Sequence, residues 1–230
     1  MADRLLIHIG CGFTAGPSWR NFDASPTLVF ERLPLVGRLY TRNQQRFPAA
    51  VRYGDIVRRP LCPPATADAV FTSHMLEHVA LDDMRRALRH ILTMLKPGAP
   101  LRLIVPDLES RARAYVAAAE RGDGAAAHHF MAGADLGVAS EPASRLARLA
   151  RMLGNATHKW MYDRATMTTE LTAAGFDRIQ RCRLGDSADV PELAEIEEAG
   201  RYAGPDGPEL ALEARRPATE SEDSSLNPTN

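Results

Sequence analysis

The chain has 230 residues, of which 45% are hydrophobic, and this length and composition suit one domain with a sizeable buried core. Its 28 basic and 29 acidic side chains leave a formal net charge of −1, so we expect no nucleic-acid partner. The three cysteines are odd in number and far apart, which excludes a disulfide framework and a Cys-x-x-Cys metal site. We find no secretory signal and no run of about 18 apolar residues that would span a membrane, and therefore expect a cytoplasmic protein.

The first half of the chain predicts a parallel sheet. Leu5–Ile9 is mostly apolar, as in a strand buried on both faces, and it runs into Gly10-Cys11-Gly12. Further short strands are predicted at residues 19–23, 51–53, 68–73 and 101–105. Between the last two, residues 82–96 carry apolar side chains at helical spacing, with Asp82 or Asp83 as the cap and Pro97-Gly98 as the stop. Strand, helix and strand in this order form a βαβ unit with a right-handed crossover.

The second half of the chain predicts further helices and two closing strands. Helices are expected at residues 109–121, 144–152 and 164–174, and strands at residues 179–184 and 209–214. We expect one domain over residues 1–216 and, because apolar residues are almost absent, a disordered tail over residues 217–230. Residues 27–47 and 111–160 are interpreted as insertions on the sheet that form a substrate cover or a dimer surface.

Candidate ligand-binding groups fall at the carboxyl ends of the predicted strands, where ligands of such sheets bind. These groups are Gly10-Cys11-Gly12, Asp23, Asp55 and Ser73-His74. Residues 10–15 satisfy a relaxed dinucleotide fingerprint, which keeps an NAD(P)-dependent oxidoreductase as an alternative. However, Gly16-Pro17 interrupts the chain where a helix should receive the pyrophosphate. A ligand with a ribose and a base but no phosphate fits better, with Asp23 accepting from the ribose hydroxyls and Asp55 from an adenine amine.

Six segments together, in this order and spacing, resemble the class I S-adenosylmethionine-dependent methyltransferases, in particular a small bacterial subgroup linked to glycan and glycolipid pathways. They cover about residues 5–108 and 158–184 and read LIHIGCG, WRNFD, GDI, ADAVFTSHMLEHV, LKPGAPLRLIVPDL and AAGF. The resemblance implies an α/β fold, a Rossmann-like three-layer sandwich. Its seven-stranded sheet would be mostly parallel with an antiparallel last strand, although the helix after the first strand is truncated here.

The resemblance also implies which residues hold S-adenosylmethionine. The glycine turn would hold its methionine end, Asp23 the ribose and Asp55-Ile56 the adenine, while residues 73–75 would line it near the transferred methyl. Glu77 and His78 match the family's Glu-His pair. The implied cofactor-binding residues are Gly10, Cys11, Gly12, Asp23, Asp55, Ile56, Ser73, His74, Met75 and His78. His8 stands where an acid or Asn is usual, which leaves a catalytically inactive, methyltransferase-like binding protein as a further alternative.

The expected reaction is in-line methyl transfer to a sugar or another small hydroxyl acceptor. A hydroxyl acceptor must lose its proton to a His or Asp within hydrogen-bond reach. We interpret His158 as the base and Asp107 as the group that orients it or the acceptor. The other candidate histidines are His74, His128 and His129.

Other polar side chains lead to weaker expectations. The chain has no tight metal-ligand spacing, so we predict no metal ligands, with Mg²⁺ held by Asp107 and Glu109 as an alternative. Arg111 and Arg113 either form a solvated helix face or contact a sugar, and His90 is expected in solvent. A homodimer is also considered.

Overall fold

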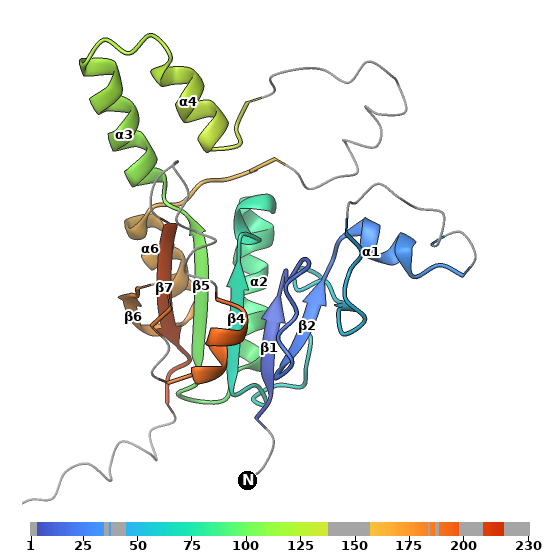
Figure 1. Ribbon diagram of the computed structural model, residues 1–230. Coiled ribbons are helices and arrows are strands. Elements are labelled where there is room, and N and C mark those ends of the chain that lie inside the picture. Colours follow the sequence, from blue (N-terminus) through green and yellow to red (C-terminus); the bar gives the residue numbers. More distant parts are fainter. Residues whose placement is uncertain are drawn as a thin grey trace, which may run out of the picture.

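A seven-stranded sheet forms the centre of the structure, in the order β3-β2-β1-β4-β5-β7-β6 (Figure 1). The computed structural model describes residues 4–34, 37, 45–137, 157–183, 185–186, 189–197 and 209–218. The strands are β1 (Leu6–Ile9), β2 (Trp19–Asp23), β3 (Arg52–Tyr53), β4 (Ala69–Ser73), β5 (Pro100–Pro106), β6 (Asp177–Arg181) and β7 (Glu209–Arg215). β7 lies antiparallel to β5 and β6, and the other neighbouring pairs are parallel. The predicted α/β fold class, a Rossmann-like sandwich with an antiparallel last strand, is therefore confirmed.

The helices follow the sequence pattern closely where a side chain caps them. They are α1 (Pro26–Glu31), α2 (Leu81–Met94), α3 (Leu108–Glu120), α4 (Ala126–Gly133) and α6 (Arg164–Ala174), with 3-10 turns η1 (Leu76–His78) and η2 (Pro191–Glu195). α6 has its predicted bounds because Asp163 caps its start and Gly175, at φ 101°, ends it. The cap expected for α2 is wrong, since Ala80 occupies that position and Asp82 and Asp83 lie in the first turn. Their charges still favour the helix there.

Several sequence predictions concern residues whose structure is not described. The predicted helix at residues 144–152, residues 219–230 of the predicted tail, and Leu184 at the end of a predicted strand all lie outside the described residues. α4 was not predicted, because its sequence, AAHHFMAG, carries no helical pattern of polar and apolar residues. In the part of the chain that is described, no helix is both long and apolar enough to cross a lipid bilayer.

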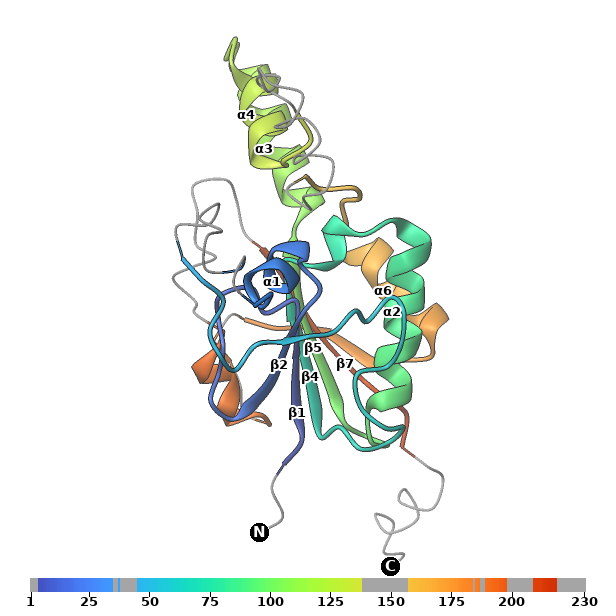
Figure 2. The ribbon, with the colours of Figure 1, turned by 90° about the vertical axis from the view of Figure 1, so that its right-hand side faces the viewer.

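The two faces of the sheet are covered in different ways (Figure 2). α2 and α6 cover one face, and their buried side chains, such as Leu88, Ile91 and Leu171, form the larger core with the strands. The other face is covered by residues 189–197, which contain η2 and form the η2 segment. Its Val190, Leu193 and Ile196 pack against side chains of β1, β2, β4, β5 and β7. Residues 10–18, between β1 and β2, contain no helix, as the sequence predicts. The η2 segment therefore covers part of the face opposite α2.

A helical hairpin projects beyond the carboxyl ends of the strands (Figure 1). It consists of α3 and α4, whose facing sides include the Tyr115 and Phe130 rings with centroids 5.6 Å apart. α3 begins directly after β5, where the Asp107 carboxylate accepts hydrogen bonds from the backbone N–H groups of Glu109 and Ser110. The described part of the insertion predicted at residues 111–160 thus lies above the edge of the sheet where ligands of such folds bind.

A buried ion pair attaches the η2 segment to the sheet. Arg102 in β5 lies with its Nη2 2.5 Å from the Oε1 atom of Glu197, and the two side chains are 3% and 1% exposed. The same Glu197 oxygen accepts from the backbone N–H of Gly185 at 2.9 Å. Ile196, the neighbour of Glu197, lines a cavity at the carboxyl edge of the sheet. The ion pair therefore also sets one wall of that cavity.

We expect Glu197→Leu to lower the free energy of unfolding by about 3–5 kcal/mol, because it leaves the Arg102 guanidinium buried without its carboxylate. Arg102→Met combined with Glu197→Leu should recover most of this loss. Arg113→Ala is the matched control, since the Arg113–Glu109 pair has a similar distance of 2.6 Å but side chains that are 77% and 51% exposed. It should change the stability by less than about 0.5 kcal/mol. Urea unfolding measures all four proteins, and equal losses in the two single variants would contradict this interpretation.

Candidate active site

Two cavities adjoin at the carboxyl ends of the central strands. They have volumes of about 400 Å³ and about 560 Å³, and Gly10, Asp23 and His74 line both. These volumes lie in the range of small-molecule and cofactor sites. All of the residues predicted to bind the cofactor line one or both cavities: Gly10, Cys11, Gly12, Asp23, Asp55, Ile56, Ser73, His74, Met75 and His78. The structure thus brings these residues together, while their binding role stays a prediction.

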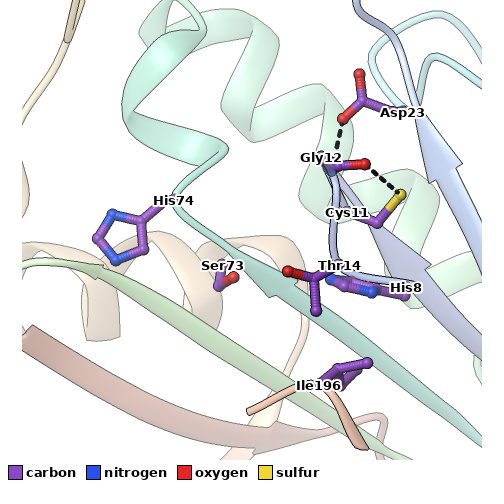
Figure 3. Close-up of a pocket in the computed structure, with 9 residues that line it drawn as sticks. His8, Cys11, Gly12, Thr14, Asp23, Ser73, His74 and Ile196 are labelled. Atoms are coloured by element: carbon purple, nitrogen blue, oxygen red, sulfur yellow. Dashed lines mark hydrogen bonds between the residues drawn. The ribbon is translucent and has the colours of Figure 1, made fainter. Parts of the chain in front are cut away.

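The glycine turn after β1 exposes its backbone to the smaller cavity (Figure 3). Gly10 has a φ of 67°, and a Cβ atom there would lie 2.6 Å from the Cγ atom of Met75. Gly12, at φ 53°, has no atom within 4 Å of its Cβ position. The Asp23 carboxylate accepts hydrogen bonds from the backbone N–H groups of Gly12 at 2.9 Å and Ser25 at 2.7 Å. The first two strand ends are therefore joined by one carboxylate whose oxygens retain further lone pairs for a ligand.

Cys11 in the same turn is not a nucleophile. Burial, reinforced by the negative charge of Asp23, raises the pKa of its thiol to about 12. The protonated thiol donates a weak hydrogen bond to the carbonyl oxygen of Gly12, with the sulfur 3.7 Å from the oxygen (Figure 3). Because the thiolate is the reactive form, Cys11 contributes shape and packing here.

The larger cavity ends at the loop after β3. The Asp55 carboxylate accepts from the backbone N–H of Val57 at 3.0 Å and lies 3.1 Å from the Nε atom of Arg58, and the Ile56 side chain is buried. The Nδ1 atom of His90 donates to the carbonyl oxygen of Ile56 at 2.6 Å. The expectation that His90 is solvated is therefore wrong, because α2 packs beneath this loop and the imidazole holds its backbone.

His8 is buried beneath the smaller cavity. Its ring contacts those of Trp19 and Phe71, which also contact each other, and its Nδ1 atom is 3.3 Å from the Oδ1 atom of Asn21. The Asn21 amide nitrogen already donates to two backbone carbonyls, so its oxygen must accept and Nδ1 of His8 carries the proton. Asn21, on the neighbouring strand, thereby fixes the imidazole that replaces the usual acid or Asn.

A second group of ionisable side chains begins at His74. This residue has a φ of 48°, in the left-handed region that residues other than glycine seldom adopt and that is found at functional sites. Its Nδ1 atom lies 3.2 Å from Oε1 of Glu77, and its Nε2 atom lies 3.7 Å from Oε2 of Glu209. In Figure 3 the ring points away from Asp23 and Gly12. His74 therefore links the two cavities to two buried carboxylates.

Arg111 belongs to this second group. Its Nη2 atom lies 3.3 Å from Oε1 of Glu209, and both side chains are 8% exposed. The alternative of a solvated face is therefore wrong for Arg111 but holds for Arg113, whose side chain is exposed and paired with Glu109. Burial raises the pKa of Glu209, although the nearby His74 and Arg111 oppose the shift. Glu209 was not among the predicted site residues, yet an antiparallel strand that starts opposite Pro106 places its first side chain at this edge.

His158 reaches the group through backbone hydrogen bonds. The N–H groups of Lys159 and Trp160 donate to the carbonyl oxygen of Glu77 at 2.7 Å and 3.2 Å. The Nδ1 atom of His158 donates to the carbonyl oxygen of Ala134 at 2.7 Å. Its Nε2 atom lies 3.9 Å from Oε1 of Glu77. Burial lowers the pKa of His158, against the opposing charge of Glu77, so the neutral ring with a lone pair on Nε2 is favoured.

Asp107 plays a different local role from the one we expected. One of its oxygens caps α3, and the other lies 3.8 Å from Nη2 of Arg181. The carboxylates that lie near Nε2 of His158 are those of Glu77, at 3.9 Å, and Asp135, at 3.7 Å. Orientation of His158 by Asp107 thus stays a prediction without a contact to support it. Glu109 pairs with Arg113, and this arrangement does not favour Mg²⁺ between Asp107 and Glu109.

Comparison with known proteins identifies the class. Residues 10–181 match the family described as "Methyltransferase domain", and the chain belongs to this family. A search of the curated proteins finds no match. The fold is that of the class I S-adenosylmethionine-dependent methyltransferases.

Solved structures with this fold share little sequence with the chain. An S-adenosylmethionine-dependent methyltransferase from Thermotoga maritima, described as a possible histamine N-methyltransferase, is 17% identical, with a TM-score of 0.48 over 94% of this chain and 84% of that one. One from Archaeoglobus fulgidus is 15% identical, with a TM-score of 0.47 over 93% and 86% of the two chains. Human N-acetylserotonin methyltransferase, in complex with S-adenosylmethionine, is 16% identical, with a TM-score of 0.44 over 94% of this chain and 48% of that one.

The glycine turn leads to a prediction about stability. Gly10→Ala adds a side chain both in a left-handed conformation and against Met75, whereas Gly98→Ala meets only the conformational strain of φ 76° in open space. We expect Gly98→Ala to lose about 1–2 kcal/mol and Gly10→Ala to lose roughly 1–3 kcal/mol more from overpacking. Thermal and urea unfolding measure both. Equal losses would show that the contact with Met75 does not constrain the turn.

Proposed function

We propose that this protein transfers a methyl group from S-adenosylmethionine to a hydroxyl oxygen of a sugar or another small acceptor. Membership of the methyltransferase domain family supports methyl transfer. The observation that supports oxygen as the target is the buried His158 imidazole. Its Nδ1–H is held by the carbonyl oxygen of Ala134, which leaves a lone pair on Nε2 to receive a proton. An amine acceptor would need no such base.

The residues present fit the proposed cofactor. The two cavities continue from the glycine turn, past Asp23, to Asp55, so a nucleoside with a short charged side chain has a continuous wall. Gly12 offers open space beside its backbone, where a side chain would fill the cradle. We propose that Asp23 accepts from the ribose hydroxyls and that Asp55-Ile56 contact the adenine. Bound S-adenosylmethionine would supply a sulfonium methyl with a neutral leaving group.

The chain itself would contribute position and a proton acceptor. The left-handed His74 and the residues beside it line both cavities, so they fix the end of the site nearest to Glu77 and His158. Holding two reactants in line supplies much of the catalysis of such a displacement. His158 would take the acceptor's proton on Nε2, and Arg111 would keep the charge of Glu209 compensated. The same proposal includes four further points: a saccharide acceptor, a cytoplasmic location, a homodimer and membership of a glycan-related bacterial subgroup.

The nicotinamide alternative is less well supported. Residues 10–18 contain no helix whose N-terminus could receive a pyrophosphate. A binding measurement separates the two functions, because a ligand that binds only the folded protein must raise its melting temperature. We expect S-adenosylhomocysteine, and not NAD(P)H, to raise the Tm. The reverse result would favour an oxidoreductase, and no shift with either would favour a binding protein that lacks methyl transfer.

Asp23→Asn should weaken binding of S-adenosylhomocysteine by about ten- to a hundredfold, the equivalent of one charge-assisted hydrogen bond. In the wild type both oxygens of Asp23 accept hydrogen bonds, one from the N–H of Gly12 and one from the N–H of Ser25. In the variant the amide NH₂ faces one of these N–H groups, so two donors oppose each other. Asp163→Asn is the matched control, since Asn caps a helix as well as Asp does and Asp163 caps α6 away from the cavities. Isothermal titration calorimetry of both variants measures the effect. Unchanged affinity in Asp23→Asn would remove this residue from the site.

His158→Ala should lower kcat by about a hundredfold or more, with cofactor affinity nearly unchanged, because the acceptor's proton loses its base. His129→Ala is the control, since the side chain of His129 is 74% exposed. Turnover is followed by mass spectrometry of hydroxyl acceptors incubated with methyl-labelled cofactor. Near-normal turnover of His158→Ala would move the role to His74, His128 or, if His129→Ala is impaired instead, to His129.

A further inference from the structure

His78, which lines the larger cavity, belongs to a compact set of three candidate ligands. Glu77, His78 and His158 each offer one nitrogen or oxygen atom, and these atoms all lie within 4.8 Å of one another. Glu77 and His78 belong to η1, and His158 is brought to them by the hydrogen bonds on the carbonyl oxygen of Glu77. The centroids of the two imidazole rings are 5.0 Å apart, at an interplanar angle of 65°. His78 also lines the cavity that holds Asp55.

The Glu77 carboxylate supplies an independent sign of a ligand. Its side chain is 0% exposed, and among the described residues neither of its oxygens has a hydrogen bond. The charged or titratable atoms near it in the described residues are two imidazole nitrogens, Nδ1 of His74 at 3.2 Å and Nε2 of His158 at 3.9 Å. Burying a carboxylate without hydrogen bonds is strongly unfavourable, and buried charges are normally paired or bound to a metal.

Both histidines are oriented as metal ligands usually are. The Nδ1 atom of His158 donates to the carbonyl oxygen of Ala134 at 2.7 Å, and Nδ1 of His78 lies 3.3 Å from the carbonyl oxygen of Thr157. A carbonyl oxygen can only accept, so each Nδ1 carries the proton and each Nε2 keeps its lone pair. Donation of the second ring N–H to a backbone carbonyl is the usual support of a metal-bound histidine.

We propose that Glu77, His78 and His158 bind one divalent transition-metal ion beside the cofactor cavity. Two imidazoles and one carboxylate suit Zn²⁺, Mn²⁺, Fe²⁺ or Co²⁺, and leave coordination positions open, whereas Mg²⁺ and Ca²⁺ prefer oxygen ligands. Glu77 and His78 are adjacent in the sequence, but His158 lies far from them, which explains why no tight spacing of three ligands is visible. This site replaces the prediction of no metal ligands and differs from the alternative of Mg²⁺ on Asp107 and Glu109.

The function of such an ion rests on the proposed methyl transfer to oxygen. Open coordination positions beside the cavity lined by His78 would hold an acceptor oxygen and lower the pKa of its hydroxyl, so that its proton could pass to water before the oxygen receives the methyl group. The lone pair on Nε2 of His158 cannot bind a metal ion and a proton at the same time. His158 is therefore a metal ligand in the metal-bound protein and a base only in the metal-free one.

The first test is titration of the chelator-treated, full-length protein with Co²⁺, followed by the visible absorption of the bound ion. We expect one equivalent to bind, and Glu77→Gln, His78→Ala and His158→Ala each to weaken binding by more than about a hundredfold, since loss of even an outer-shell partner weakens metal binding by about 10–100-fold. Glu109→Gln and His129→Ala are the matched controls and should bind as the wild type does. Absence of stoichiometric binding, or loss of binding in the controls instead, would overturn the proposal.

The second test separates a ligand from a merely structural carboxylate. In the metal-free protein, Glu77→Gln removes a buried charge without hydrogen bonds, so its Tm should equal or exceed that of the wild type. Zn²⁺ should raise the Tm of the wild type and leave that of Glu77→Gln unchanged. A lower Tm in metal-free Glu77→Gln, together with no effect of Zn²⁺ on the wild type, would show that the carboxylate is structural and would overturn the proposal.

The same protein preparations distinguish failure of the metal site from failure of the proposed function. Wild-type protein that binds Co²⁺ but methylates no hydroxyl acceptor would leave the metal site standing and contradict the proposed function. Wild-type protein that methylates a hydroxyl acceptor but binds neither Co²⁺ nor Zn²⁺ would contradict the metal site alone. If both hold, treatment with a chelator should lower turnover, and added Mn²⁺ or Zn²⁺, but not Mg²⁺, should restore it.

Discussion

The candidate active site depends on one residue, Glu77, which joins two distant parts of the chain. Its carbonyl oxygen accepts from the N–H groups of Lys159 and Trp160, and its carboxylate lies in the interior beside two imidazoles. A few residues further along, Leu108 donates to the carbonyl oxygen of Tyr162, so the returning segment is held along β5 as well. Without these backbone bonds the His158 side chain would have no fixed place at the sheet. The two cavities, by contrast, are lined by residues between His8 and Arg86, together with Ile196 from the η2 segment.

Several ionisable side chains gather around Glu77 although the region is buried. Glu77 and Glu209 are both buried, His74 contacts each of them, and Arg111 balances Glu209 alone. Like charges held in a region of low dielectric raise the energy of the folded protein, and such groups persist where binding or catalysis uses them. The left-handed backbone at His74 adds strain at the same point. The two apolar cores on either face of the sheet must offset both contributions.

Local patterns predicted much of the fold, and tertiary contacts account for what they missed. α6 was predicted to the residue because its cap and its stop are both local. The start of α2 was predicted one residue too late, because Ala80 at the N-cap has no capping side chain to mark it. The residues that line the cofactor cavities lie in short motifs at strand ends, so their gathering at one edge follows from the parallel sheet. A polar residue on a helix does not reveal from the sequence which element packs against it. Arg111 was therefore not recognised as buried against Glu209. Asp107 was assigned to His158 because both lie at this edge, but its carboxylate caps α3.

The orientation of His158 decides between two uses of the same lone pair. In a Ser-His-Asp triad the carboxylate accepts the imidazole N–H and leaves the other nitrogen for the reacting proton. Here the N–H of His158 goes to the carbonyl oxygen of Ala134, and the Glu77 carboxylate faces the side of the ring that carries the lone pair. A carboxylate and a lone pair repel each other unless a proton or a cation lies between them. The lone pair of His158 thus lies beside a buried carboxylate and a second imidazole, an arrangement in which one cation could be shared by all three groups.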